Sequence, residues 1–436
     1  MSLFGSLFAG VSGLSAQSRS MGMISDNIAN VNTTAYKGAV AQFSNLVTGR
    51  LTSTTHTPGG VRAYSLFEID RQGLIQATAS GTDAAISGAG FFVVNTASDS
   101  SSEQLYTRAG SFQPDALGNL VTPSGHFLQG WALDADENII DVNNLATVNV
   151  NVINRLATAT TNVDVGANLS ADTPAYSNTP PYDVTLAAPG SVNMASGGVE
   201  PHFTRSVQVY DKLGRPQNLT MGFLKTAANN WDVEIYATDP TAVTAPNGLV
   251  TSGTLTFDGS GTLAGNSVAP ANITWAAASG VDPSTISFDF GTIGEVDGMT
   301  QFASPTSVSY VLGNGAEVGE LNGVKIDNEG FVIASFTNGE ERPIYRLPIS
   351  TFSNPTGLDP RSGNVYARSD LAGEFNLRTA GAGGAGLITT NALEAANVDL
   401  ADEFTKMIVT QRAYSANARI ITTTNDMLEE LMQLSR

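Results

Sequence analysis

The chain has 436 residues, of which only 14% are charged, and its 21 basic and 40 acidic residues give a net charge of −19. This acidity argues against nucleic-acid binding, which needs clustered Lys and Arg. Cysteine is absent and the three histidines are far apart, which excludes disulfides and a cysteine nucleophile and argues against metal or cofactor sites. No apolar run is long enough to predict membrane insertion.

The acidic charge is concentrated in the middle of the chain. Residues 1–50 carry +2 and residues 391–436 carry −3, so residues 51–390 carry −18. Like charge keeps a protein soluble and opposes random association, whereas nearly neutral segments can approach one another closely. We therefore expect the two ends to have a role different from that of the body.

The first thirty residues predict a helix with a narrow apolar seam at 3–4 spacing. Four glycines, each costing about 1 kcal/mol relative to Ala, make this helix weak in isolation. A secretory signal peptide is disfavoured, because no basic residue precedes the apolar part and Ser and Gly interrupt it. The apolar members of the seam are Phe4, Leu7, Val11, Leu14, Met21 and Ile28.

The last forty residues predict a second, longer helix with the same spacing. The two seams at opposite chain ends favour a coiled coil that brings the termini together. We expect the seams to order by packing against other subunits; the alternative is an ordinary pair of terminal helices packed on its own domain. The apolar members of this seam are Phe404, Met407, Tyr414, Ala418, Ile421 and Leu428.

Between the helices the sequence predicts a body rich in β-strands, so the fold class is multidomain and mainly β with a terminal α-helical coiled coil. Alternating apolar residues predict strands at Val148–Val152 and at Ile286–Phe290, and Trp231 and Trp275 are expected to anchor a core. The expected organisation is a helical domain from 1–30 and 395–436, an extended connector over 31–65, a middle β domain from 66–145 and 290–370, an outer β domain over 146–289, and a Gly-rich linker over 371–394.

Two short motifs resemble ligand sites but lack the required context. Residues 381–386 match GxGxxG, yet no βαβ unit surrounds them, so a linker is the better interpretation. Asp134–Asn138 resembles the start of a calcium loop, but Ile139 and Leu145 stand where glycine and glutamate are needed. No catalytic motif is present, and the sequence indicates a protein that is not an enzyme.

After the first predicted helix the chain carries a short signature made of Asn27, Ala29, Asn30, Asn32, Thr33, Tyr36 and Lys37. Further blocks follow it in order: Gly73–Thr78, Asp83–Val94, Asn354–Leu358 and Leu393–Leu400. Together these blocks resemble one family, the bacterial flagellar rod and hook proteins. The usual signature of that family has glycine where this chain has Ala35.

The resemblance implies a structural subunit. The insertion over 146–289 is similar to the outer domain of the hook members, and rod members are shorter there. A hook subunit polymerises into a hollow, curved helical tube that acts as a universal joint and transmits motor torque from rod to filament. The terminal helices would then form the inner tube, with the two β domains further out.

The resemblance also implies partners and location. The expected partners are the chain itself, the hook-cap protein, the distal rod protein, the hook–filament junction protein and the flagellar type III export apparatus. The expected location is the extracellular flagellar hook, reached without a cleaved signal peptide. Two alternatives stay open: a distal rod-type axial protein with an insertion, and a secreted β-rich adhesin or hydrolase, which would not need matched helical seams.

Overall fold

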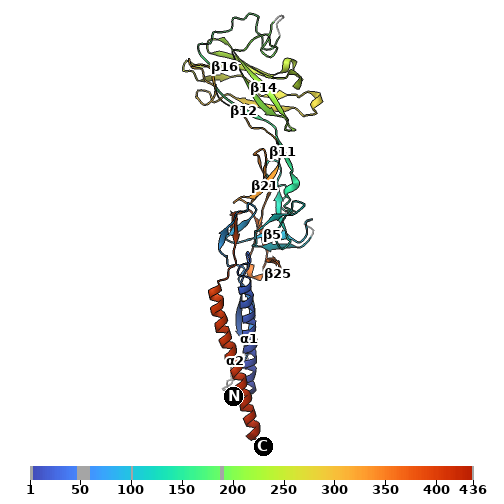
Figure 1. The fold of residues 1–436 in the computed structure, drawn as a ribbon, viewed down its shortest axis with the longest axis vertical. Coiled ribbons are helices and arrows are strands. Elements are labelled where there is room, and N and C mark those ends of the chain that lie inside the picture. The colour runs from blue at the N-terminus through green and yellow to red at the C-terminus, as the bar shows by residue number, and fades with distance from the viewer. Residues whose placement is uncertain (1–2, 47–58, 100–101, 187–190, 435–436) are drawn as a thin grey trace. The chain divides into compact units, whose positions relative to one another are not determined.

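The computed structural model describes residues 3–46, 59–99, 102–186 and 191–434, which divide into two compact units (Figure 1). Both units are discontinuous, because the chain leaves the first unit, builds the second and returns. The first unit comprises Met1–Val152, Gly323–Ser335 and Glu341–Arg436, and the second comprises Ile153–Asn322 and Phe336–Glu340.

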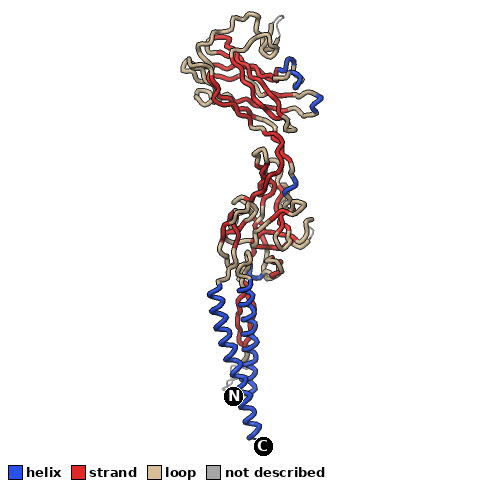
Figure 2. Tube along the Cα trace, viewed as in Figure 1, coloured by secondary structure: helices blue, strands red, loops and turns tan. Residues whose placement is uncertain are grey.

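Two long helices from the chain ends pair in the first unit, which confirms the predicted joining of the termini. Helix α1 (Leu3–Ala29) and helix α2 (Leu400–Leu434) lie side by side (Figures 1 and 2). They are antiparallel, since Asn27 contacts Glu403 at one end and Gly10 lies against Ile421 near the other. No helix in the described residues combines the length and apolar character that crossing a membrane requires.

The prediction of an extended connector over 31–65 is partly wrong, because residues 39–45 and 61–67 form a β-hairpin. Strand β1 (Ala39–Asn45) pairs antiparallel with β2 (Val61–Phe67), and the hairpin packs along α1. The Val61 N–H donates to Ser12 Oγ at 3.2 Å, and Arg19 donates to the Ala63 carbonyl at 3.5 Å. The hairpin forms because α1 offers partners that local sequence does not reveal; residues 47–58 of the predicted connector lie outside the described residues.

The β part of the first unit is built around a sheet with strand order β22-β23-β9-β5-β6-β26-β25. Every residue of β5 is buried, and aromatic rings of Phe91, Tyr106 and Tyr366 pack in its core. The strands are β5 (Phe91–Asn95), β6 (Gln104–Thr107), β7 (Gln113–Pro114), β8 (Leu120–Val121), β9 (Phe127–Ala132), β10 (Ala146–Thr147), β22 (Phe331–Phe336), β23 (Glu341–Arg346), β24 (Ile349–Phe352), β25 (Asp359–Arg361), β26 (Val365–Ala367) and β27 (Phe375–Arg378), with the 3₁₀ turns η1 (Val150–Val152) and η5 (Pro355–Gly357).

The segment expected to be a Gly-rich linker instead contributes three strands to this unit. Besides β27, which pairs with β24, strand β28 (Leu387–Thr390) pairs with β4 (Ala84–Ser87), and β29 (Ala392–Glu394) pairs with β3 (Ile75–Ala77). The glycines turn the chain between strands, with a hydrogen bond from the Gly381 N–H to the Gly386 carbonyl. The linker prediction failed because strands this short gain their stability from distant partners.

The second unit contains two sheets with a core between them. One sheet has the order β13-β14-β15-β16-β17 and the other β18-β19-β12-β20, and apolar residues from both form one cluster that includes the predicted anchors Trp231 and Trp275. The strands of these sheets are β12 (Asn162–Asn168), β13 (Phe203–Tyr210), β14 (Pro216–Ala227), β15 (Asn230–Ala237), β16 (Leu249–Phe257), β17 (Leu263–Asn266), β18 (Ala271–Ile273), β19 (Ser284–Asp289) and β20 (Ser307–Gly313), with 3₁₀ turns η2 (Pro240–Ala242), η3 (Pro246–Gly248) and η4 (Ala277–Ser279). Two further strands, β11 (Arg155–Thr158) and β21 (Ala316–Ile326), pair antiparallel with each other outside these two sheets.

The second unit extends further along the chain than the outer domain expected over 146–289. Residues 290–322 belong to it, because β20 pairs antiparallel with β12. The predicted strand around Ile286 is confirmed as β19, with alternate residues buried. The strand predicted over Val148–Val152 is wrong, since Val150–Val152 form a 3₁₀ turn, η1, after the two-residue strand β10.

Candidate functional site

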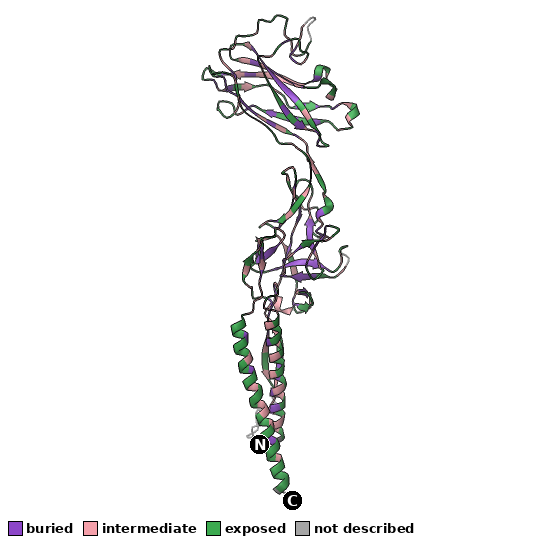
Figure 3. Ribbon diagram, in the orientation of Figure 1, coloured by how far each residue is buried: buried purple, intermediate pink, exposed green. Residues whose placement is uncertain are grey.

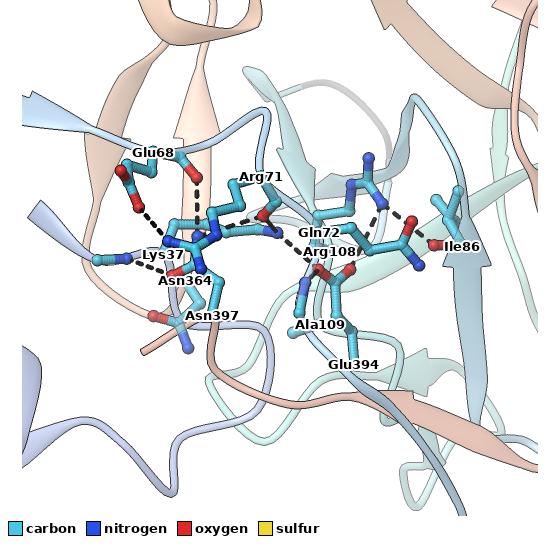
Figure 4. A network of polar contacts seen from close by, with 12 residues as sticks. Lys37, Glu68, Arg71, Gln72, Ile86, Arg108, Ala109, Asn364, Glu394 and Asn397 are labelled. Atoms are coloured by element: carbon cyan, nitrogen blue, oxygen red, sulfur yellow. Dashed lines mark hydrogen bonds and ion pairs between the residues drawn. The ribbon is translucent and has the colours of Figure 1, made fainter. Parts of the chain in front are cut away.

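A buried carboxylate lies where the two helices meet the β part of the first unit. Glu394, on β29, is fully buried, and its two oxygens face two cations (Figure 4). Lys37 Nζ is 2.6 Å from Glu394 Oε1, and Arg108 Nη1 is 3.4 Å from Glu394 Oε2. Both cationic side chains are also buried, so one carboxylate joins the residues after α1, a β segment and the strand leading to α2.

Backbone groups complete the coordination of this carboxylate and of Lys37. The Gly73 N–H donates to Glu394 Oε1 at 2.7 Å, and the Ala35 N–H donates to the Glu394 carbonyl at 2.7 Å. Lys37 Nζ also donates to the Arg71 carbonyl at 2.7 Å. A buried charge costs several kcal/mol unless it is paired and hydrogen-bonded, and here both conditions hold.

Arg108 is held by more than the ion pair. Its guanidinium donates to the carbonyls of Ile86 and Gly88 and lies 5.2 Å from the centre of the Phe91 ring. Burial lowers the pKa of Arg108 and of Lys37, while the nearby Glu394 carboxylate acts in the opposite direction on both. The cluster therefore depends on Glu394 to keep two buried cations favourable.

A second polar cluster joins α1, β1 and α2 through the signature residue Asn27. Its Oδ1 accepts from the Ala39 N–H, and its Nδ2 donates to the Ala39 carbonyl, both at 2.9 Å. The same Nδ2 donates to Glu403 Oε2 at 3.2 Å, and Tyr36 donates to Asn27 Oδ1 at 3.2 Å. An amide is suited to this position because it donates and accepts at once.

The other signature residues shape the turn after α1. Asn30 donates to the Asp26 carbonyl and Thr33 donates to Asn30, whereas Ala29 and Asn32 are exposed. Ala35 has a φ of 56°, a left-handed conformation that glycine adopts without strain. This backbone requirement explains why the signature usually has glycine at the position of Ala35.

The Glu394 cluster and the Asn27 cluster together form the junction between the helices and the β part of the first unit. Asn397 and Asn364, which are not signature residues, add hydrogen bonds to this junction. Asn397 accepts from the Gly38 N–H at 2.8 Å and donates to the carbonyls of Glu68 and Arg71, while Asn364 donates to the Thr34 carbonyl at 2.9 Å. Glu394 and Arg108 were also missed, although both stand in or beside family-like blocks. The charge of a side chain does not by itself reveal its partner: Glu394 pairs with Lys37, which is 357 residues away in the sequence.

The closest approach of the two helices involves small residues of α1 that face Asn417 and the predicted seam residue Ile421 of α2. A Cβ built on Gly10 would lie 3.1 Å from Ile421 Cγ1, and one on Gly13 would lie 2.8 Å from Asn417 Nδ2, so the helices approach closely there. The buried threonines of α2 satisfy their own hydroxyls within the helix. The buried residues of the pair are Gly10, Gly13, Ala16, Ser20, Ile24, Asn27, Glu403, Thr410 and Thr424.

The structure leaves four of the twelve predicted seam residues exposed, and most of α2 is coloured as exposed in Figure 3. Phe4 is 70% exposed, Phe404 is 52% exposed, and Val11 and Tyr414 are also exposed. The remaining seam residues are half-buried: Leu7, Leu14, Met21, Ile28, Met407, Ala418, Ile421 and Leu428. The chain's own fold thus covers one face of the helices and leaves large apolar residues at the surface.

The junction has the character of a structural clamp. Its buried charges form ion pairs with one another, although Arg108 Nε has no hydrogen-bond partner, and the described residues contain no group of three or more His, Asp or Glu arranged to hold a metal ion. In the segment Asp134–Asn138, which was expected to be a turn rather than a calcium loop, Asp134 Oδ1 accepts from the backbone N–H groups of Asp136 and Asn138.

Four protein families match the chain in order. Residues 7–37 match the flagella basal body rod protein family, and residues 85–168 match the flagellar hook protein FlgE/F/G D1 domain. Residues 199–316 match the flagellar basal body protein FlaE D2 domain, and residues 389–434 match the flagellar basal body rod FlgEFG protein C-terminal family. The two terminal matches fall on α1 with the junction and on α2.

Full-length relatives agree with these matches. The flagellar hook protein FlgE of Rhizobium meliloti is 33% identical, and that of Brucella suis is 34% identical, each over 100% of both chains. The crystal structure of Helicobacter pylori flagellar hook protein FlgE2 is 15% identical with a TM-score of 0.47, covering 73% of this chain and all of that one. The name shared by the full-length relatives separates the hook interpretation from the rod and adhesin alternatives.

Proposed function

Because the chain belongs to the flagellar hook protein family and is a structural subunit of the hook, we propose that its terminal helices assemble with those of other copies into the wall of a hollow tube. The observation that carries this proposal is the large apolar surface on α1 and α2 that the chain's own fold leaves uncovered. Exposed apolar side chains in such number are costly in a monomer and typical of an interface. The predicted seams are the contacts proposed between copies.

The proposed positions of the two β domains follow from this arrangement. The middle β domain and the outer domain would lie outside the tube wall, and their acidic, polar surfaces would permit the sliding that a bending, torque-transmitting joint needs. The function is structural rather than catalytic. Export through the flagellar type III apparatus to the cell exterior, and contacts with the hook-cap, distal rod and hook–filament junction proteins, come from the family resemblance.

Electron microscopy of concentrated purified protein tests the proposal directly. We expect helical tubes from the wild-type chain and none from Val11→Glu or Phe404→Glu, because each places a charge in an apolar contact between copies. Ile140→Glu is the matched control, since Ile140 is 67% exposed and lies outside the helices. Circular dichroism checks that the variants keep their fold; folded wild-type protein that stays monomeric at all concentrations would refute the proposal.

A further inference from the structure

An apolar groove lies beside the helix pair at its junction end. It has a volume of about 300 Å³ and is bounded by α1, β1 and α2. Its walls include Ile24, Val40, Phe43 and Val409, and Val409 is 61% exposed. Small residues also line the groove: Ser20, Ala39 and Ala41.

The charged residues at the rim of the groove neutralise each other. Lys406 Nζ is 2.7 Å from Glu403 Oε1, which leaves no uncompensated cation to attract an acidic partner. A bound segment would therefore have to be apolar and uncharged to avoid a desolvation cost. This requirement restricts which part of another copy could fit.

The opposite end of the same helix pair offers two candidate segments. The N-terminal segment of α1 exposes Phe4, Phe8 and Val11, and no charged residue occurs in the chain before Arg19. The C-terminal segment of α2 exposes Leu431 and Met432 but also carries Asp426, Glu429 and Glu430. Those acidic groups would lose solvation in a groove that has no free cation to pair with them, so charge favours the uncharged N-terminal segment.

We infer that the groove receives the Phe4–Val11 face of α1 from a second copy of this chain, an inference that rests on the proposed assembly. Phe8 and Ile24 are separated by sixteen residues of helix, or about 24 Å. A protruding apolar segment at one end and a groove at the other make a contact that is not self-complementary. Such a contact repeats from copy to copy without closing, as an open helical polymer requires.

Cysteine cross-linking tests this contact, because the chain contains no cysteine of its own. Two chains are prepared, one with Phe8→Cys and one with Val409→Cys, and small amounts of both are copolymerised with excess wild-type chain and then mildly oxidised. Separate chains ensure that any 8–409 disulfide joins two copies, and the wild-type excess keeps the tubes intact. We expect a reducible product at twice the 45.3 kDa chain mass.

Two matched pairs give the outcomes that would overturn the inference. Phe8→Cys with Ser415→Cys, on another face of α2, should yield no product, and neither should Leu431→Cys with Val409→Cys. A disulfide between positions 409 and 431, in place of one between positions 8 and 409, would assign the groove to the C-terminal segment of α2 instead. Tubes without an 8–409 product refute the docking while leaving assembly in place, whereas failure of the wild-type chain to form tubes refutes the proposed function.

Discussion

At the residue scale, Glu394 determines how the junction holds together. Its carboxylate offsets two buried cations and accepts a hydrogen bond from the Gly73 N–H, while its main-chain carbonyl accepts one from the Ala35 N–H. Removing one partner from a buried charge cluster costs more than the cluster contributes, because the remaining charges stay buried and unpaired. The stability of the junction is therefore most sensitive to substitution of Glu394.

Glu394→Gln keeps the shape of the side chain but removes its charge. We expect the opening free energy of β3 and β29 to fall by about 3–5 kcal/mol, since Lys37 and Arg108 lose their counter-charge. Hydrogen exchange of the amides in these two strands measures the change locally. Glu341→Gln is the control, because the Lys325–Glu341 pair is about half exposed and should contribute less than about 1 kcal/mol; equal effects would contradict the clamp.

His202 gives the second unit a predictable pH dependence. Its Nδ1 accepts from the Lys225 N–H at 3.0 Å, and burial, followed by the nearby Lys225 charge, lowers the pKa of His202. Between this lowered pKa and the ordinary value of 6.5 the unfolded chain binds more protons, so stability is lost as pH falls through that window.

The test compares wild-type protein with His202→Asn by urea unfolding at pH 7 and pH 5. Burial raises the pKa of Glu234, and this shift favours the folded state as pH falls, opposite to the effect of His202. The quantity to compare is therefore the loss of unfolding free energy between pH 7 and pH 5 in the two proteins. We expect the wild type to lose more stability than the variant between the two pH values. An identical loss in both proteins would exclude His202 as the source.

At the element scale, α1 is a helix that depends on its neighbours. Its glycines weaken it intrinsically, yet two of them let α2 approach closely, and β1 and β2 cover another side. Packing rather than propensity stabilises the helix. Glycines that face a neighbour and glycines that face open space should therefore respond to substitution in opposite directions.

Gly13→Leu and Gly22→Ala test this difference. A side chain at position 13 would meet Asn417, whereas no atom lies within 4 Å of a Cβ built on Gly22. We expect Gly13→Leu to increase hydrogen exchange in α2 around Asn417 as the helices separate, and Gly22→Ala to stabilise α1 by about 1 kcal/mol. Equal protection of α2 in wild type and Gly13→Leu would show that the helices do not pair through Gly13.

At the scale of the whole molecule, charge and apolar surface oppose each other. The net charge of −19 repels neighbouring copies, while the uncovered apolar residues of α1 and α2 favour association. Salt screens the repulsion, with a Debye length of about 10 Å at 0.1 M, and does not weaken apolar burial. Assembly should therefore be controlled by ionic strength.

We expect the concentration needed for polymerisation to fall as sodium chloride rises from about 20 to about 200 mM. Light scattering across a dilution series measures this threshold, and Val11→Glu serves as the control that should not polymerise at either salt concentration. A threshold that rises with salt would mean that ionic contacts, rather than apolar helix surfaces, drive assembly.

The amino-acid sequence by itself determined the helical ends, the acidic β-rich body, the core anchors and the family, because these depend on local periodicity and on motifs read along the chain. Tertiary structure alone decided which helix face is covered, since Gly10, Gly13 and Thr410 carry no apolar signal yet form the buried side. It also decided that the expected connector is a hairpin and that Glu394 meets Lys37 and Arg108. Long-range pairing places such groups together, and sequence spacing carries no record of distance across the fold.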